Sequence, residues 1–205
     1  MPELCFESSS GMEEIEDNFK NIDFYTEVMG GLKEALAHAK VDRALRTIQM
    51  GCHQRSMIFY SGQKSERVAL MKHISNVSED IGIPCVYVHA EKNEDFLNCL
   101  LVHLAELADT IGAEEPRGGE DLTSTLVEFG RVAKRIGNAV CICVDEMQHL
   151  KSGEIAALTT AIHRCNQLRL PILVVGVGTP AILKAVGKAC PYAERLFQYE
   201  AFDKV

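Results

Sequence analysis

Apolar residues in this chain form two kinds of pattern, which alternate along the sequence. Short unbroken apolar runs, bounded by polar residues or glycine, are typical of strands buried on both faces of a parallel sheet. Apolar residues at every third or fourth position are typical of helices with one buried face. The runs predict strands at 57–60, 83–89, 139–144, 171–175 and 199–202. The repeats predict helices at about 69–74, 95–111, 121–136, 153–167 and 181–188, so the pattern favours an α/β fold.

The first fifty residues differ from the rest. Residues 1–22 are acidic, and we expect them to form a solvated or mobile N-terminal arm. Residues 21–50 have helical spacing. The pair Gly30-Gly31 is expected to break this run before a first helix, and Gly51 to end a second one. The domain itself is therefore assigned to residues 23–205.

Composition narrows the class of protein. With 205 residues, 47% of them hydrophobic, the chain has the size and balance of a single soluble domain. The formal net charge of −8 argues against sequence-independent binding of nucleic acid. No apolar run is long enough to span a membrane and no secretory signal is present, so we expect a cytoplasmic protein. The eight cysteines include no CxxC pair, which favours reduced core thiols over a zinc site.

The polar residues after the apolar run 139–144 are the strongest candidates for chemistry. Asp145 and Glu146 are adjacent and end a predicted buried strand. Ligand sites of open α/β sheets lie at such carboxyl ends. The segment resembles a Walker B element of a P-loop ATPase, which implies that Asp145 helps to hold Mg²⁺ and that Glu146 polarises the water that attacks the terminal phosphate. The alternative is structural, because carboxylates also favour the N-terminus of a helix that follows a strand.

The segment after the first predicted strand has the setting of a phosphate-binding loop, which joins a strand to a helix through a glycine-containing turn. Aligned with the pattern GxxxxGK[ST], it has Ser61 at the first Gly, Glu66 at the second, Arg67 at the Lys and Val68 at the Ser/Thr. Glu66 would place a negative charge beside an anion, and Val68 has no hydroxyl for Mg²⁺. Two interpretations remain open: a nucleotide loop with altered residues, or a turn that only joins strand to helix.

Two further segments complete an ordered set of motifs. The strand at 171–175 ends in Gly176-Val-Gly-Thr-Pro180, and Tyr192-Ala-Glu-Arg-Leu-Phe197 precedes the last predicted strand. Together with Asp145-Glu-Met-Gln148, these segments resemble P-loop ATPases of the AAA+ superfamily, in particular a bacterial group related to the origin-recognition and STAND-type branches. The resemblance covers residues from about 42 to 202, and its motifs are specific in combination rather than singly.

This resemblance implies an α/β, three-layer αβα P-loop NTPase fold with a five-stranded parallel sheet in the order 5-1-4-3-2. It implies that Asp145 is the metal ligand and that Glu146 is the catalytic base. Thr179 lies near the family's sensor position, and Arg195 matches an arginine that can act toward a neighbouring subunit. Such proteins normally continue into a helical lid after the last strand, and the resemblance therefore implies a core domain without its lid.

Structural alternatives exist for several of these residues. For Thr179, the N-cap of the helix that follows it is the better interpretation. Arg195 could instead form a surface ion pair with Glu194 or Glu200. His89 is a lone histidine at the end of a predicted strand, and a structural role is the better interpretation of it.

These observations leave two functions open. In the first, the chain is an AAA+ ATPase-like domain with weakened or lost ATP binding and hydrolysis, which acts as an assembly or protein-interaction module. In the second, it is an active ATPase that binds ATP and Mg²⁺, in a DNA-transaction complex. Its phosphate loop would then include Gly62 and use Lys64 or Arg67 as the cation, with Glu146 as the base. Both functions imply self-association or a protein partner, without direct contact to nucleic acid. Whether the chain is an enzyme stays open.

Overall fold

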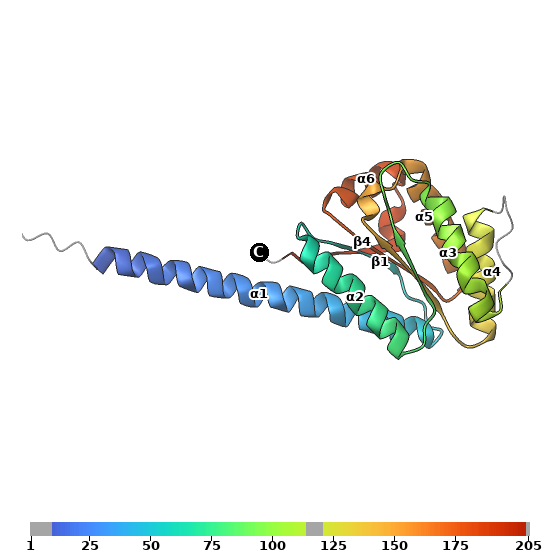
Figure 1. Cartoon of the computed structure of the whole chain (residues 1–205), viewed down its shortest axis with the longest axis horizontal. Coiled ribbons are helices and arrows are strands. Elements are labelled where there is room, and N and C mark those ends of the chain that lie inside the picture. Colours follow the sequence, from blue (N-terminus) through green and yellow to red (C-terminus); the bar gives the residue numbers. More distant parts are fainter. Residues whose placement is uncertain (1–9, 114–120, 204–205) are drawn as a thin grey trace, which may run out of the picture.

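A sheet of five parallel strands lies at the centre of the computed structural model, which describes residues 10–113 and 121–203 (Figure 1). The strands are β1 (Ser56–Tyr60), β2 (Cys85–His89), β3 (Val140–Asp145), β4 (Ile172–Gly178) and β5 (Phe197–Ala201). Their order is β2-β3-β4-β1-β5, which is the predicted order 5-1-4-3-2 read from the opposite edge. The predicted fold class is therefore confirmed.

Helices cover both faces of the sheet. One layer holds α1 (Ser10–Gln49) and α2 (Lys64–Asp80), and the other holds α3 (Phe96–Ile111), α4 (Leu122–Arg135) and α5 (Ser152–Gln167). A short 3-10 turn, η1 (Met147–His149), follows β3, and α6 (Ala181–Ala189) and α7 (Ala193–Leu196) lie between β4 and β5 in the chain. Within the described residues, no helix has the length and apolar character needed to cross a bilayer.

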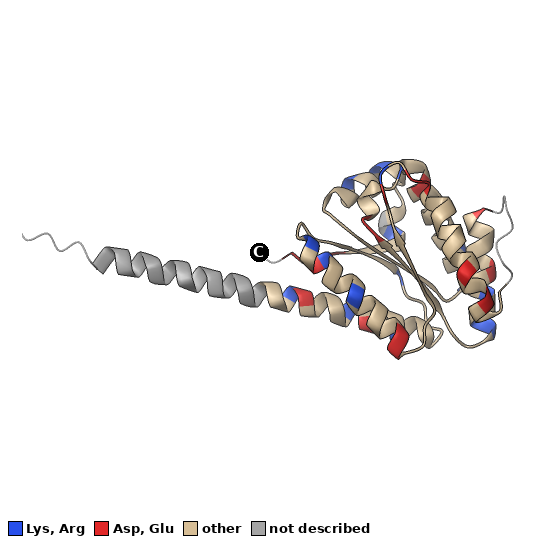
Figure 2. Cartoon of the chain, viewed as in Figure 1, with Lys and Arg blue, Asp and Glu red and all other residues tan. Residues whose placement is uncertain are grey.

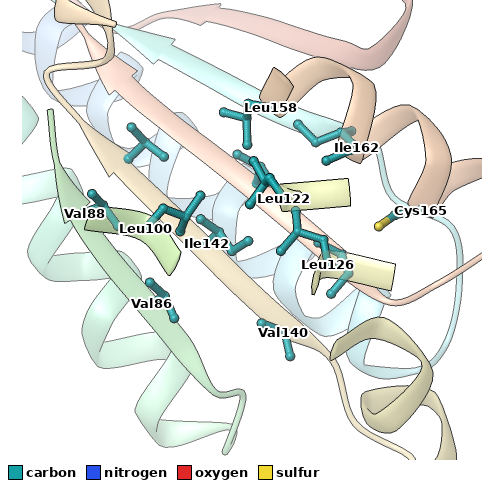
Figure 3. Close-up of a cluster of buried hydrophobic side chains, with 14 of the residues drawn as sticks. Val86, Val88, Leu100, Leu122, Leu126, Val140, Ile142, Leu158, Ile162 and Cys165 are labelled. Atoms are coloured by element: carbon teal, nitrogen blue, oxygen red, sulfur yellow. The ribbon is translucent and has the colours of Figure 1, made fainter. Parts of the chain in front are cut away.

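Alternate residues of β1, β2, β3 and β4 enter two separate cores. On the side of α3, α4 and α5, Val140 and Ile142 of β3 pack among leucines of these helices (Figure 3). On the opposite side, Cys141 and Cys143 of the same strand pack with residues of α1 and α2. A strand buried on both faces must be apolar at every position, which explains the unbroken run at 139–144.

The helix ends have local causes. The carboxylate of Asp95 accepts a hydrogen bond from the first turn of α3 at 3.1 Å, and Asp121 caps α4 in the same way. The helix α5 begins at Ser152, and its N-cap residue is Lys151. Glu154 accepts the N–H of Lys151 at 2.7 Å, which satisfies a backbone donor at the start of this helix.

The largest difference from the sequence-based prediction concerns α1. It is a single helix of 40 residues that continues through Gly30-Gly31, so the break predicted there is wrong. A glycine costs a helix only about 1 kcal/mol relative to alanine, and packing of the later turns of α1 against α2 and the sheet offsets this cost. The acidic segment 1–22 is helical from Ser10, and residues 1–9 lie outside the described part. The end of α1 is as predicted, since Gly51 follows with φ of 73°.

Candidate functional site

The predicted site residues lie in segments that follow β1, β3 and β4, at the carboxyl ends of the strands. Ser61 follows β1, Asp145 ends β3 and Gly178 ends β4. Parallel strands bring such segments together, and α/β sheets bind their ligands at this edge. The N–H of Ser61 donates to the carbonyl of Gly178 at 3.0 Å, so the segments after β1 and β4 are joined directly.

The segment between β1 and α2 is shorter than a phosphate-binding loop. Only Ser61, Gly62 and Gln63 separate the strand from the helix, which begins at Lys64. The N–H of Arg67 donates to the carbonyl of Gln63 at 3.4 Å, as in the first turn of a helix. The positions aligned with the second Gly, the Lys and the Ser/Thr of the loop pattern therefore lie inside α2.

Arg67 links this helix to the end of β3. Its Nη1 donates to the carbonyl oxygen of Ser61 at 2.9 Å, and its Nη2 donates to Oε1 of Glu146 at 2.8 Å. The side chains of Arg67 and Glu146 are only 7% and 13% exposed. Glu66, which is also buried, accepts a hydrogen bond from the hydroxyl of Ser61. The cation that the alignment placed at the phosphates is thus held between protein oxygens.

Glu146 is held as a carboxylate despite its surroundings. Burial pushes its pKa upward, but hydrogen bonds from Arg67 and Gln148 and the charge of Arg67 outweigh burial, and the pKa is lowered. Its backbone lies in the left-handed region, with φ of 50°, at the turn from β3 into η1. This sharp turn directs the chain back toward the end of β4.

Gln148 joins Glu146 to the segment after β4. Its Nε2 donates to Oε2 of Glu146, and its Oε1 accepts the N–H of Thr179 at 2.9 Å. A Cβ at position 178 would lie 2.5 Å from Oε1 of Gln148, so Gly178 is required for this contact. Gly176 is required two residues earlier in β4, because a Cβ there would lie 2.4 Å from the sulfur of Met147. The two glycines of the Gly-x-Gly segment therefore make room for η1.

Asp145, the expected metal ligand, contacts a histidine. Nδ1 of His89 lies 3.1 Å from Oδ2 of Asp145, and the other carboxylate oxygen accepts the N–H of Glu146 at 2.8 Å. His89 and Asp145 are register partners at the ends of β2 and β3. Sequence reasoning assigned no role to His89 at this edge. The available signal was that its strand and the strand of Asp145 both end there.

Other predicted site residues lie apart from this network. Lys64 and Val68 are exposed on the first turns of α2, with Val68 54% exposed. The N–H of Gly62 donates to Asp203, which follows β5. Arg195 is exposed on α7. Of its two alternative partners, Glu200 bonds Lys40 and Gln198. The side chain of the other, Glu194, lies outside the described part.

Thr179 is half-buried where β4 turns into α6. The N-cap position of α6 is Pro180, and no side chain caps that helix. The structural alternative for Thr179, a side-chain cap, is therefore wrong. Thr179 instead contacts the site through its backbone N–H, which donates to Gln148. The sequence motif does not indicate this contact.

No family model matches the sequence, and no curated protein matches it. Several solved structures have a similar fold. The ORC2 protein of Aeropyrum pernix, in complexes with ADPNP and ADP, superposes with a TM-score of 0.57 at 18% identity, over 82% of this chain and 47% of that one. The Aeropyrum pernix ORC1 protein in complex with DNA gives 0.52 at 14% identity, over 82% and 44%. A chain of Drosophila ORC bound to AT-rich DNA and Cdc6 gives 0.55 at 11% identity, over 100% and 35%.

These similarities establish the fold. The chain has an α/β fold similar to that of these ORC proteins, in agreement with the fold that the resemblance to AAA+ P-loop ATPases implied. It spans less than half of the length of these proteins. At such low identity, the likeness does not carry over the activity of the similar proteins.

Proposed function

We propose that this chain is an AAA+ ATPase-like domain with weakened or lost ATP binding and hydrolysis, which acts as an assembly module. The observation that carries this proposal is the ion pair between Arg67 and Glu146. In an active site of this fold, the cation faces the phosphates and the carboxylate faces the attacking water. Here the two groups neutralise each other, and a bound nucleotide would have to separate them.

Two further features support weak nucleotide binding. The short segment of Ser61, Gly62 and Gln63 offers few backbone N–H groups to cradle phosphates, since the residues after it form a helix. Glu66 adds a buried carboxylate next to Ser61, where an anion would have to approach. His89 also lies against Asp145, the residue that would hold Mg²⁺.

Thermal unfolding with millimolar Mg-ATP and Mg-ADP tests the proposal. A ligand at about 100 times its dissociation constant stabilises a protein by about 2.7 kcal/mol, which raises the midpoint by several degrees. We expect no shift with either nucleotide. The variant Glu66→Gly, Arg67→Lys, Val68→Thr serves as the comparison. A shift in this variant alone would support the replaced side chains as the cause, and no shift in either would support the short segment. A shift in the unmodified chain would contradict the proposal.

The arrangement of Asp145, Glu146 and Thr179 favours a second candidate, an active ATPase. These residues lie together at the carboxyl edge, and Gln148 connects two of them. In that case Asp145 would hold Mg²⁺, Arg67 would contact the phosphates and Glu146 would accept the proton of the attacking water. Glu146→Gln should then abolish turnover and spare nucleotide binding. Turnover that persists in this variant would exclude Glu146 as the base.

The assembly role has its own support. The similar Drosophila ORC chain belongs to a structure in which ORC is bound to Cdc6 as well as to AT-rich DNA, so the fold occurs in a protein assembly. Because the net charge of this chain is −8, we propose a protein partner rather than direct contact with nucleic acid. A gel-shift measurement at low salt checks this, and a complex with DNA there would contradict it.

A further inference from the structure

The helix α1 has two apolar faces, and only one of them is covered within the described chain. Ala37, Val41, Ala44, Leu45 and Ile48 are buried against α2 and the sheet. On the outer face, Leu32 and Leu36 are 60% and 53% exposed. Ala35 and Ala39 are exposed beside them, and Arg43 and Arg46 continue the same face toward the end of the helix. A surface helix normally places polar residues opposite its buried face, so this outer face indicates a partner.

The sequence of α1 extends the pattern of Leu32 and Leu36 toward the N-terminus. Counting in sevens from Leu36 gives Met29, Ile22 and Ile15. Counting in sevens from Leu32 gives Ala39, Tyr25 and Asn18, of which Asn18 is polar. Apolar residues at these two offset sevenfold repeats define the seam of a coiled coil. The repeat extends over residues 15–39, which is more than three heptads.

Charge is distributed unevenly along the same helix. Residues 13–27 contain six carboxylates and one lysine, whereas residues 33–46 contain four lysines and arginines and two carboxylates. Figure 2 shows that Lys and Arg recur along the described part of α1. Two copies of this helix in parallel would place the acidic segments side by side. An antiparallel pair instead places the acidic segment of each copy beside the basic segment of the other.

We propose that α1 pairs antiparallel with α1 of a second copy of this chain. The acidic segment 13–27 of each copy lies along the exposed face that runs from Leu32 to Arg46 of the other, and the twofold axis passes near residue 30. This arrangement is isologous, since the same surface serves both copies and closes at a dimer. The inference rests on the proposed function, because it names a second copy as the partner of the assembly module.

Light scattering of the full chain after size exclusion measures the oligomeric state. We expect a dimer at micromolar concentration. Leu32→Asp with Leu36→Asp should convert it to a monomer, because two carboxylates would enter the seam. Leu183→Asp, at an exposed leucine of α6, is the matched control and should leave the dimer intact. A monomeric unmodified chain, or a dimer that survives the first substitution, would overturn the proposal.

A charge exchange tests the antiparallel direction. One variant combines Arg43→Glu with Arg46→Glu, and a second combines Glu13→Lys, Glu14→Lys and Glu16→Lys. Each should raise the dissociation constant of the dimer at least tenfold. An equimolar mixture of the two variants should restore it, because both contacts of the mixed dimer then join opposite charges. Lys184→Glu with Lys188→Glu on the exposed side of α6 is the control for altered net charge. If neither variant alone weakens the dimer, the antiparallel arrangement is wrong.

The outcome is separable from the nucleotide measurement. A monomer without any nucleotide-induced shift would overturn the α1 pairing and leave the loss of ATP binding standing. A dimer whose unfolding midpoint rises clearly with nucleotide would support the α1 pairing and contradict the loss of ATP binding.

Discussion

Nη2 of Arg67 lies 2.8 Å from Oε1 of Glu146, and this contact joins the first turn of α2 to the end of β3. The two residues are 79 positions apart in the chain. Both side chains are largely buried, so each depends on the other for charge neutralisation. The contact lies at the carboxyl ends of the strands, where a nucleotide would bind in proteins of this fold.

Breaking this ion pair from one side should destabilise the protein. Arg67→Met leaves Glu146 without its main partner in a mostly buried position, and we expect a loss of about 3 kcal/mol in the free energy of unfolding. Urea denaturation followed by circular dichroism measures this loss. The control is Arg131→Ala, which removes an exposed pair with Glu128 at 3.9 Å and should cost less than about 1 kcal/mol.

The double variant Arg67→Met, Glu146→Gln should recover much of the loss, because position 146 then carries no unpaired charge. If Arg67→Met alone costs no more than the exposed control, the pair does not hold the site closed.

Stability should fall as the pH drops below about 6.5, in part through His38. Burial and the neighbouring His73 lower the pKa of His38, against the opposing charges of Glu34 and Asp42. The rings of His38 and His73 stack at 4.1 Å between α1 and α2. Because the folded-state pKa is lowered, the unfolded chain binds the proton more readily, and protonation favours unfolding. The stabilisation is present above the unfolded pKa of about 6.5 and is lost as the pH falls through the folded value.

The free energy of unfolding of the unmodified chain and of His38→Gln, measured between pH 7.5 and 5.5, checks this. The variant should show a smaller decrease over that range. His103→Gln, on an exposed position of α3, controls for the loss of an imidazole. Equal decreases in the unmodified chain and in His38→Gln would exclude His38 as a source of the pH dependence.

Gly178→Ala should be destabilising although alanine is a small residue. Its Cβ would lie 2.5 Å from Oε1 of Gln148 and displace the amide that accepts the N–H of Thr179. We expect a loss of about 1–3 kcal/mol from the strain and the unsatisfied donor. Gly187→Ala in α6 is the matched control, because its Cβ would meet nothing within 4 Å. That substitution should be neutral or stabilise by up to about 1 kcal/mol. Equal effects at the two glycines would contradict the tight packing of η1.

Gly31→Ala should stabilise the protein, because α1 is continuous there. An added Cβ meets nothing within 4 Å, and alanine favours a helix over glycine by about 1 kcal/mol. Thermal unfolding at a fixed protein concentration measures the gain. Gly51→Ala should act in the opposite direction, since φ of 73° there strains any side chain by about 1 kcal/mol. A lower midpoint for Gly31→Ala would indicate that the helix is interrupted at this position.

Much of the fold could be read from local patterns. The apolar run 139–144 indicated a strand buried on both faces, because such a strand must be apolar at every position. The strand order was implied by the resemblance to AAA+ ATPases, which rests on the segments 145–148, 176–180 and 192–197 in combination. Helix α1 was misjudged at Gly30-Gly31, because helix propensity is a local quantity of about 1 kcal/mol per residue, whereas the packing of α1 against α2 involves residues distant in sequence.

The sequence by itself determined which residues stand at the carboxyl ends of the strands, because a strand's end is visible as the end of its apolar run. It also showed that Glu66, Arg67 and Val68 replace the residues of a phosphate-binding loop. Only the tertiary structure decided that Arg67 meets Glu146, that His89 meets Asp145 and that Gln148 reaches Thr179. The physical reason is that each of these contacts joins segments far apart in the chain and depends on the direction in which each side chain leaves its turn or strand end, which neither a local pattern nor the strand order records.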